Sequence, residues 1–193
     1  MARGRPLEFD PDTALDAAME TFWDFGYGAS LSTLLERTGL SKSSLYQTFG
    51  SKDELFARSL THYVDKCFAP MRQRLEESPS GRAFLEGFVR AVADETRGSR
   101  RGCLLMNTAG AMPDDEPLQR VVKASMKRLE GHLTDAVERA QQEGDVDPAA
   151  NARDHARFLV ATLGGLKMLV RSGASRGAVL RAADIALRGL FLE

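Results

Sequence analysis

Apolar residues recur at intervals of three and four along most of this chain, the spacing that places side chains on one face of a helix. The longest such stripe covers residues 118–140. No segment shows the sustained alternation and β-branched enrichment that are typical of strands. The pattern therefore predicts an all-α protein.

Glycine, proline and capping residues divide the pattern into about nine helices. Asp10 followed by Pro11 is typical of a helix start, and Ser51 three residues before Glu54 forms a capping box. Pro70 falls inside the fourth helix, where we expect a kink or a break. The predicted helices cover residues 10–25, 31–38, 41–49, 51–78, 82–96, 103–111, 118–143, 148–172 and 176–191.

The first three helices are short and closely spaced, whereas those that follow are longer. A turn at Gly39 joins the second helix to the third, and two short helices joined in this way form a helix-turn-helix, whose second helix can enter the major groove of DNA. We therefore expect two domains. Residues 1–50 would form an N-terminal helix-turn-helix domain and residues 51–193 a larger helical domain.

Composition narrows the class of protein further. The 193 residues are 43% hydrophobic and 27% charged, which is typical of a folded globular protein. The longest nearly apolar stretch, residues 158–170, contains Lys167 and is too short to span a bilayer, and we see no signal-peptide pattern, so we expect a cytoplasmic protein without a membrane partner. Cys67 and Cys103 lack the spacing of zinc or redox motifs, and we expect both to be reduced thiols.

Charge is nearly balanced overall, with a formal net charge of −1, but it is unevenly placed. The segment from Arg37 to Lys52 contains three basic residues and no acidic one, and Arg3 and Arg5 form a second basic cluster. Two small clusters suit a protein that touches phosphates at a few points, although short basic clusters also occur on ordinary solvated surfaces.

The third predicted helix combines an apolar face with a polar face that has no carboxylate. Leu45 and Phe49 can hold the helix on a small core, while Gln47 could bind an adenine edge and Tyr46 could contact the DNA backbone. A solvated helix face would show the same pattern, so periodicity alone leaves both interpretations open.

The segment that contains this helix resembles the DNA-binding domain of TetR/AcrR-family transcriptional regulators over about residues 8–56. The resemblance is carried by Phe22-Trp23-Asp24-Phe25-Gly26-Tyr27, by Leu34-Leu35, and by the run from Thr38 to Leu55 that includes Leu45-Tyr46, Phe49 and Ser51-Lys52. It implies a helical ligand-binding and dimerisation domain after the helix-turn-helix, and a repressor that a small molecule releases from a palindromic operator. The DNA contacts that it implies are Ser30, Thr33, Lys42, Ser43, Ser44, Tyr46, Gln47 and Lys52.

The larger domain carries one distinctive segment, Arg101-Gly-Cys-Leu-Leu-Met-Asn107, which resembles a Gly-Cys-Leu-x-x-Asn signature in one subgroup of this family. Cys103 follows two arginines, so it is either a reactive thiol that senses oxidants or a small buried apolar residue. A thiol-based redox sensor is therefore our alternative function. We expect a small apolar or weakly polar effector, bound by residues of the middle helices: Phe84, Phe88, Val92, Cys103, Met106, Asn107, Met126, Phe158 and Thr162.

The last two predicted helices carry more apolar surface than packing within a single chain would bury. Gly164-Gly165 would allow another helix to approach closely. The family resemblance implies that they form a homodimer interface.

Enzymatic interpretations lack a catalytic constellation. Residues 173–177 match the Gly-x-Ser-x-Gly nucleophile pattern, but the flanks are helical and no histidine follows. The three histidines lack metal-ligand spacing. We therefore predict neither catalysis, nor a metal site, nor a cofactor.

Overall fold

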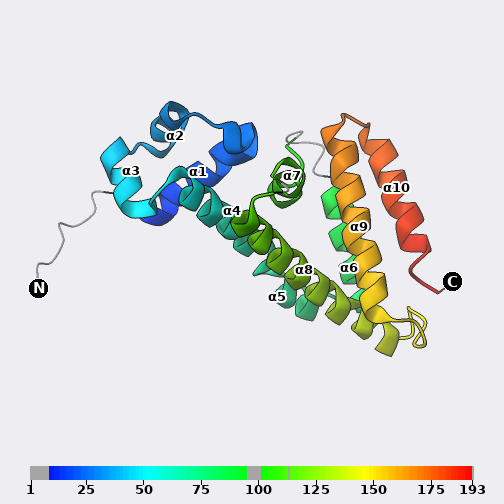
Figure 1. Ribbon diagram of the computed structural model, residues 1–193. Helices are drawn as coiled ribbons and strands as arrows, with labels where there is room; N and C mark the ends of the chain where they lie inside the picture. The colour runs from blue at the N-terminus through cyan, green and yellow to red at the C-terminus, as the bar shows by residue number, and fades with distance from the viewer. Residues whose placement is uncertain (1–8, 95–100, 113, 193) are drawn as a thin grey trace, which may run out of the picture. The chain divides into compact units, whose positions relative to one another are not determined.

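The computed structural model describes residues 9–94, 101–112 and 114–192, and within them the chain is α-helical with one short 3₁₀ helix and no strand (Figure 1). The all-α prediction is thus confirmed. The helices are α1 (Pro11–Phe25), η1 (Gly26–Gly28), α2 (Leu31–Thr38), α3 (Lys42–Phe49), α4 (Lys52–Phe68), α5 (Met71–Glu77), α6 (Gly81–Asp94), α7 (Leu104–Ala111), α8 (Glu116–Gln142), α9 (Ala152–Arg171) and α10 (Arg176–Arg188).

The predicted and observed helices agree to within two residues at most of their ends and differ more clearly at three places. The fourth predicted helix is divided into α4 and α5 around Pro70. Proline has no amide hydrogen to donate to the preceding turn, and its ring clashes with a carbonyl of that turn. α9 begins after Asn151 rather than at Pro148, because the Gln141 side chain donates to the carbonyls of Asp147 and Ala150 and stabilises a turn there. α10 ends at Arg188, before the predicted end at 191. The predicted end of the fifth helix, residue 96, lies outside the described residues.

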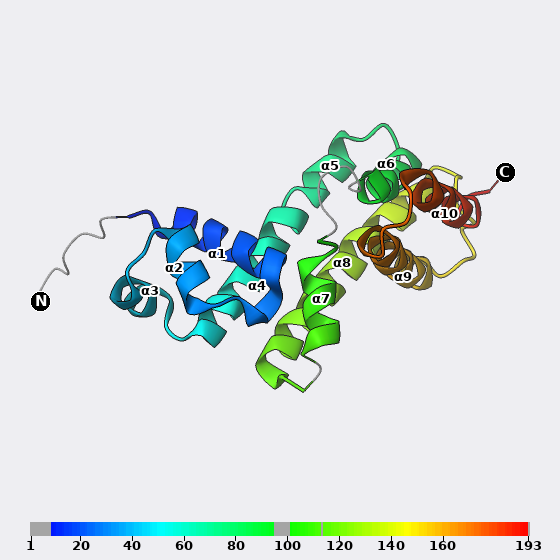
Figure 2. The same cartoon turned by 90° about the horizontal axis from the view of Figure 1, so that it is seen from above.

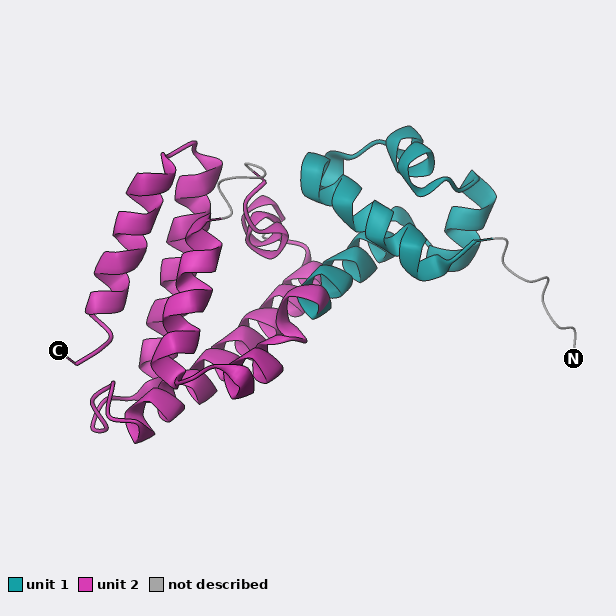
Figure 3. Cartoon of the chain, turned by 180° about the vertical axis from the view of Figure 1, so that it is seen from behind, with its two compact units in different colours: residues 1–65 teal, residues 66–193 magenta. Residues whose placement is uncertain are grey.

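The chain divides into two compact units, residues 1–65 and 66–193 (Figure 3). The division falls later than the predicted boundary at residue 50, because the first turns of α4 belong to the core of the N-terminal unit. Phe56 packs edge-on against Phe22 of α1 with ring centroids 4.8 Å apart, and Tyr63 packs in the same way against Trp23 at 5.0 Å.

In the C-terminal unit the long helix α8 packs against α5, α6, α7 and α9, while α10 packs against α6 and α9 (Figure 2). The predicted stripe on α8 lies on its buried face, with one exception: Met126 is half-buried and the neighbouring Ser125 is buried in its place. The Ser125 hydroxyl donates to the carbonyl of Val121, so its burial leaves no unpaired polar group.

The first residue of α6 touches the backbone of α8. A Cβ atom at Gly81 would lie 2.6 Å from the Ala140 nitrogen and 2.7 Å from the Ala136 oxygen. Two side chains at the carboxyl end of α8, one of which belongs to its C-cap residue, hold the chain at this place. Glu143 accepts a hydrogen bond from the Gly81 amide, and Arg139 donates to the carbonyls of Leu75 and Ser78. The approach of the two backbones therefore requires glycine at position 81.

We expect Gly81→Ala to lower the free energy of unfolding by about 1–3 kcal/mol, because α6 must move away from α8 to admit the methyl group. Gly87→Ala is the matched control on the same helix, where a Cβ would meet nothing within 4 Å. It should stabilise the protein by about 0.5–1 kcal/mol through helix propensity. Urea unfolding of both variants measures the difference, and equal effects would contradict this account of α6.

Candidate nucleic-acid interface

α2, the turn at Gly39 and α3 form a helix-turn-helix in the N-terminal unit. Gly39 lies in the left-handed region at φ +69°, where glycine has no steric penalty. Ser41 then begins α3, and its hydroxyl accepts a hydrogen bond from the Ser44 amide at 3.1 Å. Leu45 and Phe49 are buried and anchor the helix to the core of this unit. The sequence predicted each of these features from local signals.

The opposite face of α3 is exposed and has no carboxylate. Lys42, Ser43 and Gln47 are exposed, and Tyr46 keeps 38% of its surface accessible. Ser44 is half-buried, and its hydroxyl lies 2.9 Å from that of Ser41. The structure thus brings five of the eight predicted contact residues onto one short helix, where they can present hydrogen-bonding groups to a groove.

Ser30 and Thr33 lie at the start of α2, the helix before the turn. The Ser30 hydroxyl accepts a hydrogen bond from the Thr33 amide at 3.0 Å and lies 2.8 Å from the Thr33 hydroxyl. Ser30 is therefore the N-cap of α2, and the Thr33 hydroxyl contacts this cap. Ser30 is exposed and Thr33 is half-buried.

Lys52, the eighth predicted contact residue, is held against the N-terminal unit at the start of α4. Its Nζ lies 4.6 Å from the centre of the Tyr27 ring, and the Tyr27 hydroxyl donates to the Asp53 carboxylate. The sequence marked Lys52 as a basic residue but did not reveal that an aromatic ring orients it.

One of the three cations in the predicted basic segment from Arg37 to Lys52 is paired with a carboxylate in the structure. Arg37 donates to Asp24 of α1 and lies 5.1 Å from the centre of the Phe25 ring. Asp24 lies outside the basic segment from Arg37 to Lys52, so the charge pattern of that segment did not reveal this pair. The second basic cluster, Arg3 and Arg5, lies outside the described residues.

Two side chains of α4 hold its junction with α3. The Glu54 carboxylate accepts a hydrogen bond from the Ser51 amide at 2.7 Å, which completes the predicted capping box. Arg58 Nη1 donates to the Thr48 carbonyl, in the last turn of α3, at 3.1 Å. Nothing in the sequence pattern marked Arg58.

The predicted effector residues are spread over four helices of the C-terminal unit and differ in burial. Phe84 is buried and stacks on Phe88, with ring centroids 5.9 Å apart. Phe158, by contrast, keeps 47% of its surface exposed, so it does not line an interior site. The half-buried members of the set are Phe88, Val92, Cys103, Met106, Asn107, Met126 and Thr162.

The Gly-Cys-Leu-x-x-Asn segment forms the start of α7. Cys103 is its N-cap residue and is half-buried, and neither Cys103 nor Cys67 forms a disulfide. The Asn107 amide donates to the Arg101 carbonyl at 2.7 Å and accepts from Arg171 at 2.6 Å. Asn107 therefore fastens the loop before α7 to the end of α9, a role that the prediction of an effector contact did not include.

Lys167 of α9 is a half-buried cation that the sequence pattern did not assign to a site. Burial lowers its pKa from 10.5 to about 8, although the nearby Cys67 acts in the opposite direction. Lys167 is therefore an amine of the C-terminal unit whose pKa lies closer to neutral pH than that of an ordinary lysine.

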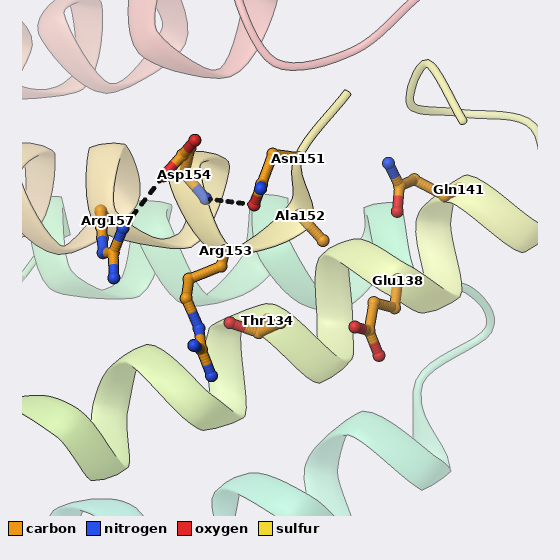
Figure 4. Close-up of a pocket in the computed structure, with 8 residues that line it drawn as sticks. All are labelled: Thr134, Glu138, Gln141, Asn151, Ala152, Arg153, Asp154 and Arg157. Carbon is orange, nitrogen blue, oxygen red and sulfur yellow. Dashed lines mark hydrogen bonds and ion pairs between the residues drawn. The ribbon is translucent and has the colours of Figure 1, made fainter. Parts of the chain in front are cut away.

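A surface hollow of about 480 Å³ lies between α8 and the start of α9 (Figure 4). Figure 4 shows Arg157 paired with Asp154, whose amide donates to Asn151 at 3.1 Å. Glu130 lies 3.4 Å from both Arg153 and Arg157. The hollow contains none of the predicted effector residues, and both of its arginines are paired with carboxylates.

The features that could have suggested an enzyme or a membrane protein have simpler explanations. Gly173, at φ +85°, ends α9, and Ser175 caps α10 by accepting a hydrogen bond from the Ala178 amide, so residues 173–177 form a turn between helices. Among the described residues, His, Cys, Asp and Glu form no group of three or more that could hold a metal ion. None of the described helices has the length and apolar character needed to cross a bilayer.

Comparison with known proteins identifies the family. The family "Bacterial regulatory proteins, tetR family" matches residues 14–58, and the family "Tetracyclin repressor-like, C-terminal domain" matches residues 81–186. The chain is 32% identical to the HTH-type transcriptional repressor ComR of Escherichia coli K12 over 97% of this chain and 91% of ComR. It is 34% identical to the uncharacterized HTH-type transcriptional regulator YezE of Bacillus subtilis 168 over 75% of this chain and 76% of YezE.

Solved structures agree with these relatives. A cysteine mutant of the TetR-family transcriptional regulator CifR, complexed with 26-bp double-strand operator DNA, superposes with a TM-score of 0.83 at 30% identity, over 97% of this chain and 100% of that chain. The chain belongs to the TetR family and is a DNA-binding transcriptional regulator rather than an enzyme.

The capping box at the start of α4 gives a pH-dependent stability. Hydrogen bonds from the Ser51 amide and hydroxyl, together with the charge of Arg58, hold the pKa of Glu54 below its ordinary 4.5. A carboxyl with a depressed folded-state pKa stabilises the fold above its unfolded-state pKa, and this contribution is lost as the pH falls through the folded-state value.

We expect the melting temperature of the wild-type protein to fall more steeply between about pH 5 and pH 3 than that of Glu54→Gln, whose amide oxygen accepts the same bond without titrating. Thermal unfolding across this pH range measures the two slopes. Parallel slopes would show that Glu54 is not coupled to folding.

Proposed function

We propose that this regulator is a homodimeric repressor that binds a palindromic operator through α3 of each protomer and is released by a small apolar or weakly polar effector. The observation that carries the proposal is the exposed face of α3, which combines hydrogen-bonding side chains, one lysine and no carboxylate. Such a face suits the major groove, where phosphates repel acidic groups and base edges offer both donors and acceptors.

The contact residues take two roles in this proposal. Gln47 is placed to read an adenine edge, since its amide can donate and accept at once. Lys42 and Lys52 neutralise phosphates, and Tyr46 fixes the register of the helix on the DNA backbone. The hydroxyls of Ser30, Thr33, Ser43 and Ser44 add backbone contacts from the starts of α2 and α3.

The dimer interface that we propose is the exposed apolar face of α9 and α10. Of seven large apolar side chains exposed in the described residues, four lie on these helices and a fifth, Leu192, follows the end of α10. Met168 and Ile185 are the most exposed, at 64% and 63%. Gly165, in the same stripe of α9, would let a partner helix approach closely, and an isologous dimer would cover both helices at once.

The effector would bind among the half-buried side chains of α6, α7, α8 and α9. Phe88, Val92, Met106 and Thr162 supply a largely apolar lining, and Lys167 supplies a polar group from α9. Binding would favour a separation of the two α3 helices that no longer matches two operator half-sites.

Selection of bound fragments from the source genome tests the DNA-binding proposal. We expect the wild type to recover a palindrome. Gln47→Ala should lose about 1–3 kcal/mol of affinity and relax specificity at one position of each half-site. Lys42→Ala should weaken operator and non-specific binding together and reduce the salt slope by about 0.9 for each phosphate that is no longer neutralised.

Arg72→Ala on α5 is the matched control, because it removes one exposed arginine that pairs with Glu76 and lies outside the N-terminal unit. It should bind as the wild type does. Recovery of the same palindrome by all four proteins, with equal affinity and equal specificity at every position, would refute the assignment of α3 as the reading helix.

The dimer interface is tested with Ile185→Asp, which places a carboxylate in the centre of the proposed contact. We expect the dimer dissociation constant to rise by roughly a hundredfold or more, because two carboxylates would have to be buried. Sedimentation velocity measures the change, with Gln73→Asp on the exposed face of α5 as the control. An unchanged dissociation constant would show that the dimer forms through a surface other than this face of α9 and α10.

The alternative function is a thiol-based redox sensor that acts through Cys103. The observation in its favour is the position of Cys103 at the start of α7, where the side chain is partly accessible. Loss of operator binding on oxidation, abolished by Cys103→Ser, would assign this input, whereas oxidation without effect would exclude it.

A further inference from the structure

We propose that Arg58 is a positioning residue for DNA reading, which acts by holding the carboxyl end of α3 from the neighbouring helix α4. The inference rests on the proposed role of α3 as the reading helix. It adds a residue that lies outside the set of expected DNA contacts and that no local sequence signal identifies.

α3 is too short to be stable alone. Its eight residues make about two turns, and helices of this length need contacts from the rest of the fold. Ser41 caps its amino end, and Leu45 and Phe49 bury its apolar face. Its carboxyl end has no basic residue in the last turn, and the only cation of the helix, Lys42, lies at the opposite end, where the helix dipole does not favour it.

Arg58 supplies the missing cation. Its Nη1 donates to the Thr48 carbonyl at 3.1 Å, a group that cannot find a partner within the helix because α3 ends one residue later. A guanidinium at this place both satisfies the carbonyl and complements the negative end of the helix dipole.

The same arginine is linked to the start of α4. Its charge acts on Glu54, one helical turn earlier, and the Glu54 carboxylate accepts the Ser51 amide at 2.7 Å. Thr48 and Ser51 therefore flank the junction between α3 and α4, and each is bound by a side chain of α4. The last turn of α3 is therefore held to α4 by the Arg58 hydrogen bond as well as by the covalent chain.

Tyr46 and Gln47 belong to this last turn. Without the hydrogen bond from Arg58 the turn would fray, so the side chains that we expect to read base edges would sample several positions, while Lys42 in the first turn would not move. The consequence is a selective loss: binding to the operator should weaken, and binding to unrelated DNA should not.

The test compares Arg58→Gln with the wild type, with Arg58→Lys as the charge-conserving variant and Arg72→Gln as the matched control for loss of one exposed arginine. We expect the operator affinity of Arg58→Gln to fall about three- to tenfold, with unchanged affinity for unrelated DNA and an unchanged salt slope. Arg58→Lys should recover part of the loss.

Hydrogen exchange in the free protein gives an independent measure. The Gly50 amide donates to the Tyr46 carbonyl at 3.0 Å and closes the last turn of α3. In Arg58→Gln this amide should exchange about three- to tenfold faster, whereas amides in the middle of α4 should be unaffected.

Three outcomes would overturn the proposal. Parallel weakening on operator and unrelated DNA, with a salt slope reduced by about 0.9, would make Arg58 a phosphate contact. Unchanged exchange at Gly50 would show that Arg58 does not hold α3. An unchanged ratio of operator affinity to affinity for unrelated DNA would show that the Arg58 hydrogen bond does not contribute to sequence recognition.

Failure of the wild type to discriminate any sequence would instead refute the proposed function, and the exchange result would still report on the hydrogen bond itself.

Discussion

The N-terminal unit depends on one constraint: a helix of two turns must be held in a fixed position although it cannot maintain itself. The apolar side of α3 contributes two buried side chains, Leu45 and Phe49, which is little surface for a whole helix. A side-chain hydrogen bond therefore stabilises each end: the Ser41 hydroxyl accepts one at the amino end, and Arg58 donates one at the carboxyl end. The exposed face between them carries hydrogen-bonding side chains and no carboxylate, as the proposed role of α3 in DNA reading requires.

The support for α3 comes from the packing of α1 against α4. The edge-on contacts of Phe22 with Phe56 and of Trp23 with Tyr63 bind the first three turns of α4 into the same core as α1. This is why the unit continues to residue 65 although its characteristic motif ends near residue 50. A helix-turn-helix recognised by its turn and caps is thus shorter than the unit that folds around it.

Much of the fold could be predicted because its signals are local. Gly39, Ser41 and the Ser51–Glu54 capping box act within four residues of themselves, and the structure places each of them at the predicted helix end. The contacts that escaped prediction join distant positions. Arg58 binds a carbonyl ten residues away, Asp24 pairs with Arg37 across the turn between α1 and α2, and Asn107 meets Arg171 from another helix. Residue type suggested chemistry for Asn107 and Arg37, whereas the fold shows that both side chains are engaged within the protein.

The pairing of Arg37 with Asp24 has a consequence for how the protein finds its site. The N-terminal unit contains six basic and ten acidic residues, and this ion pair removes one of its few cations from the field that DNA would meet. Non-specific affinity comes mainly from cations that displace counterions, so a unit of this composition is held only weakly by arbitrary sequence. We expect it to leave wrong sites quickly and to search a genome by repeated encounters from solution rather than by long excursions along one duplex. If α3 reads DNA as we propose, occupancy of the operator depends on the few polar contacts of a two-turn helix, and a single base change in a target site would remove a gene from its control.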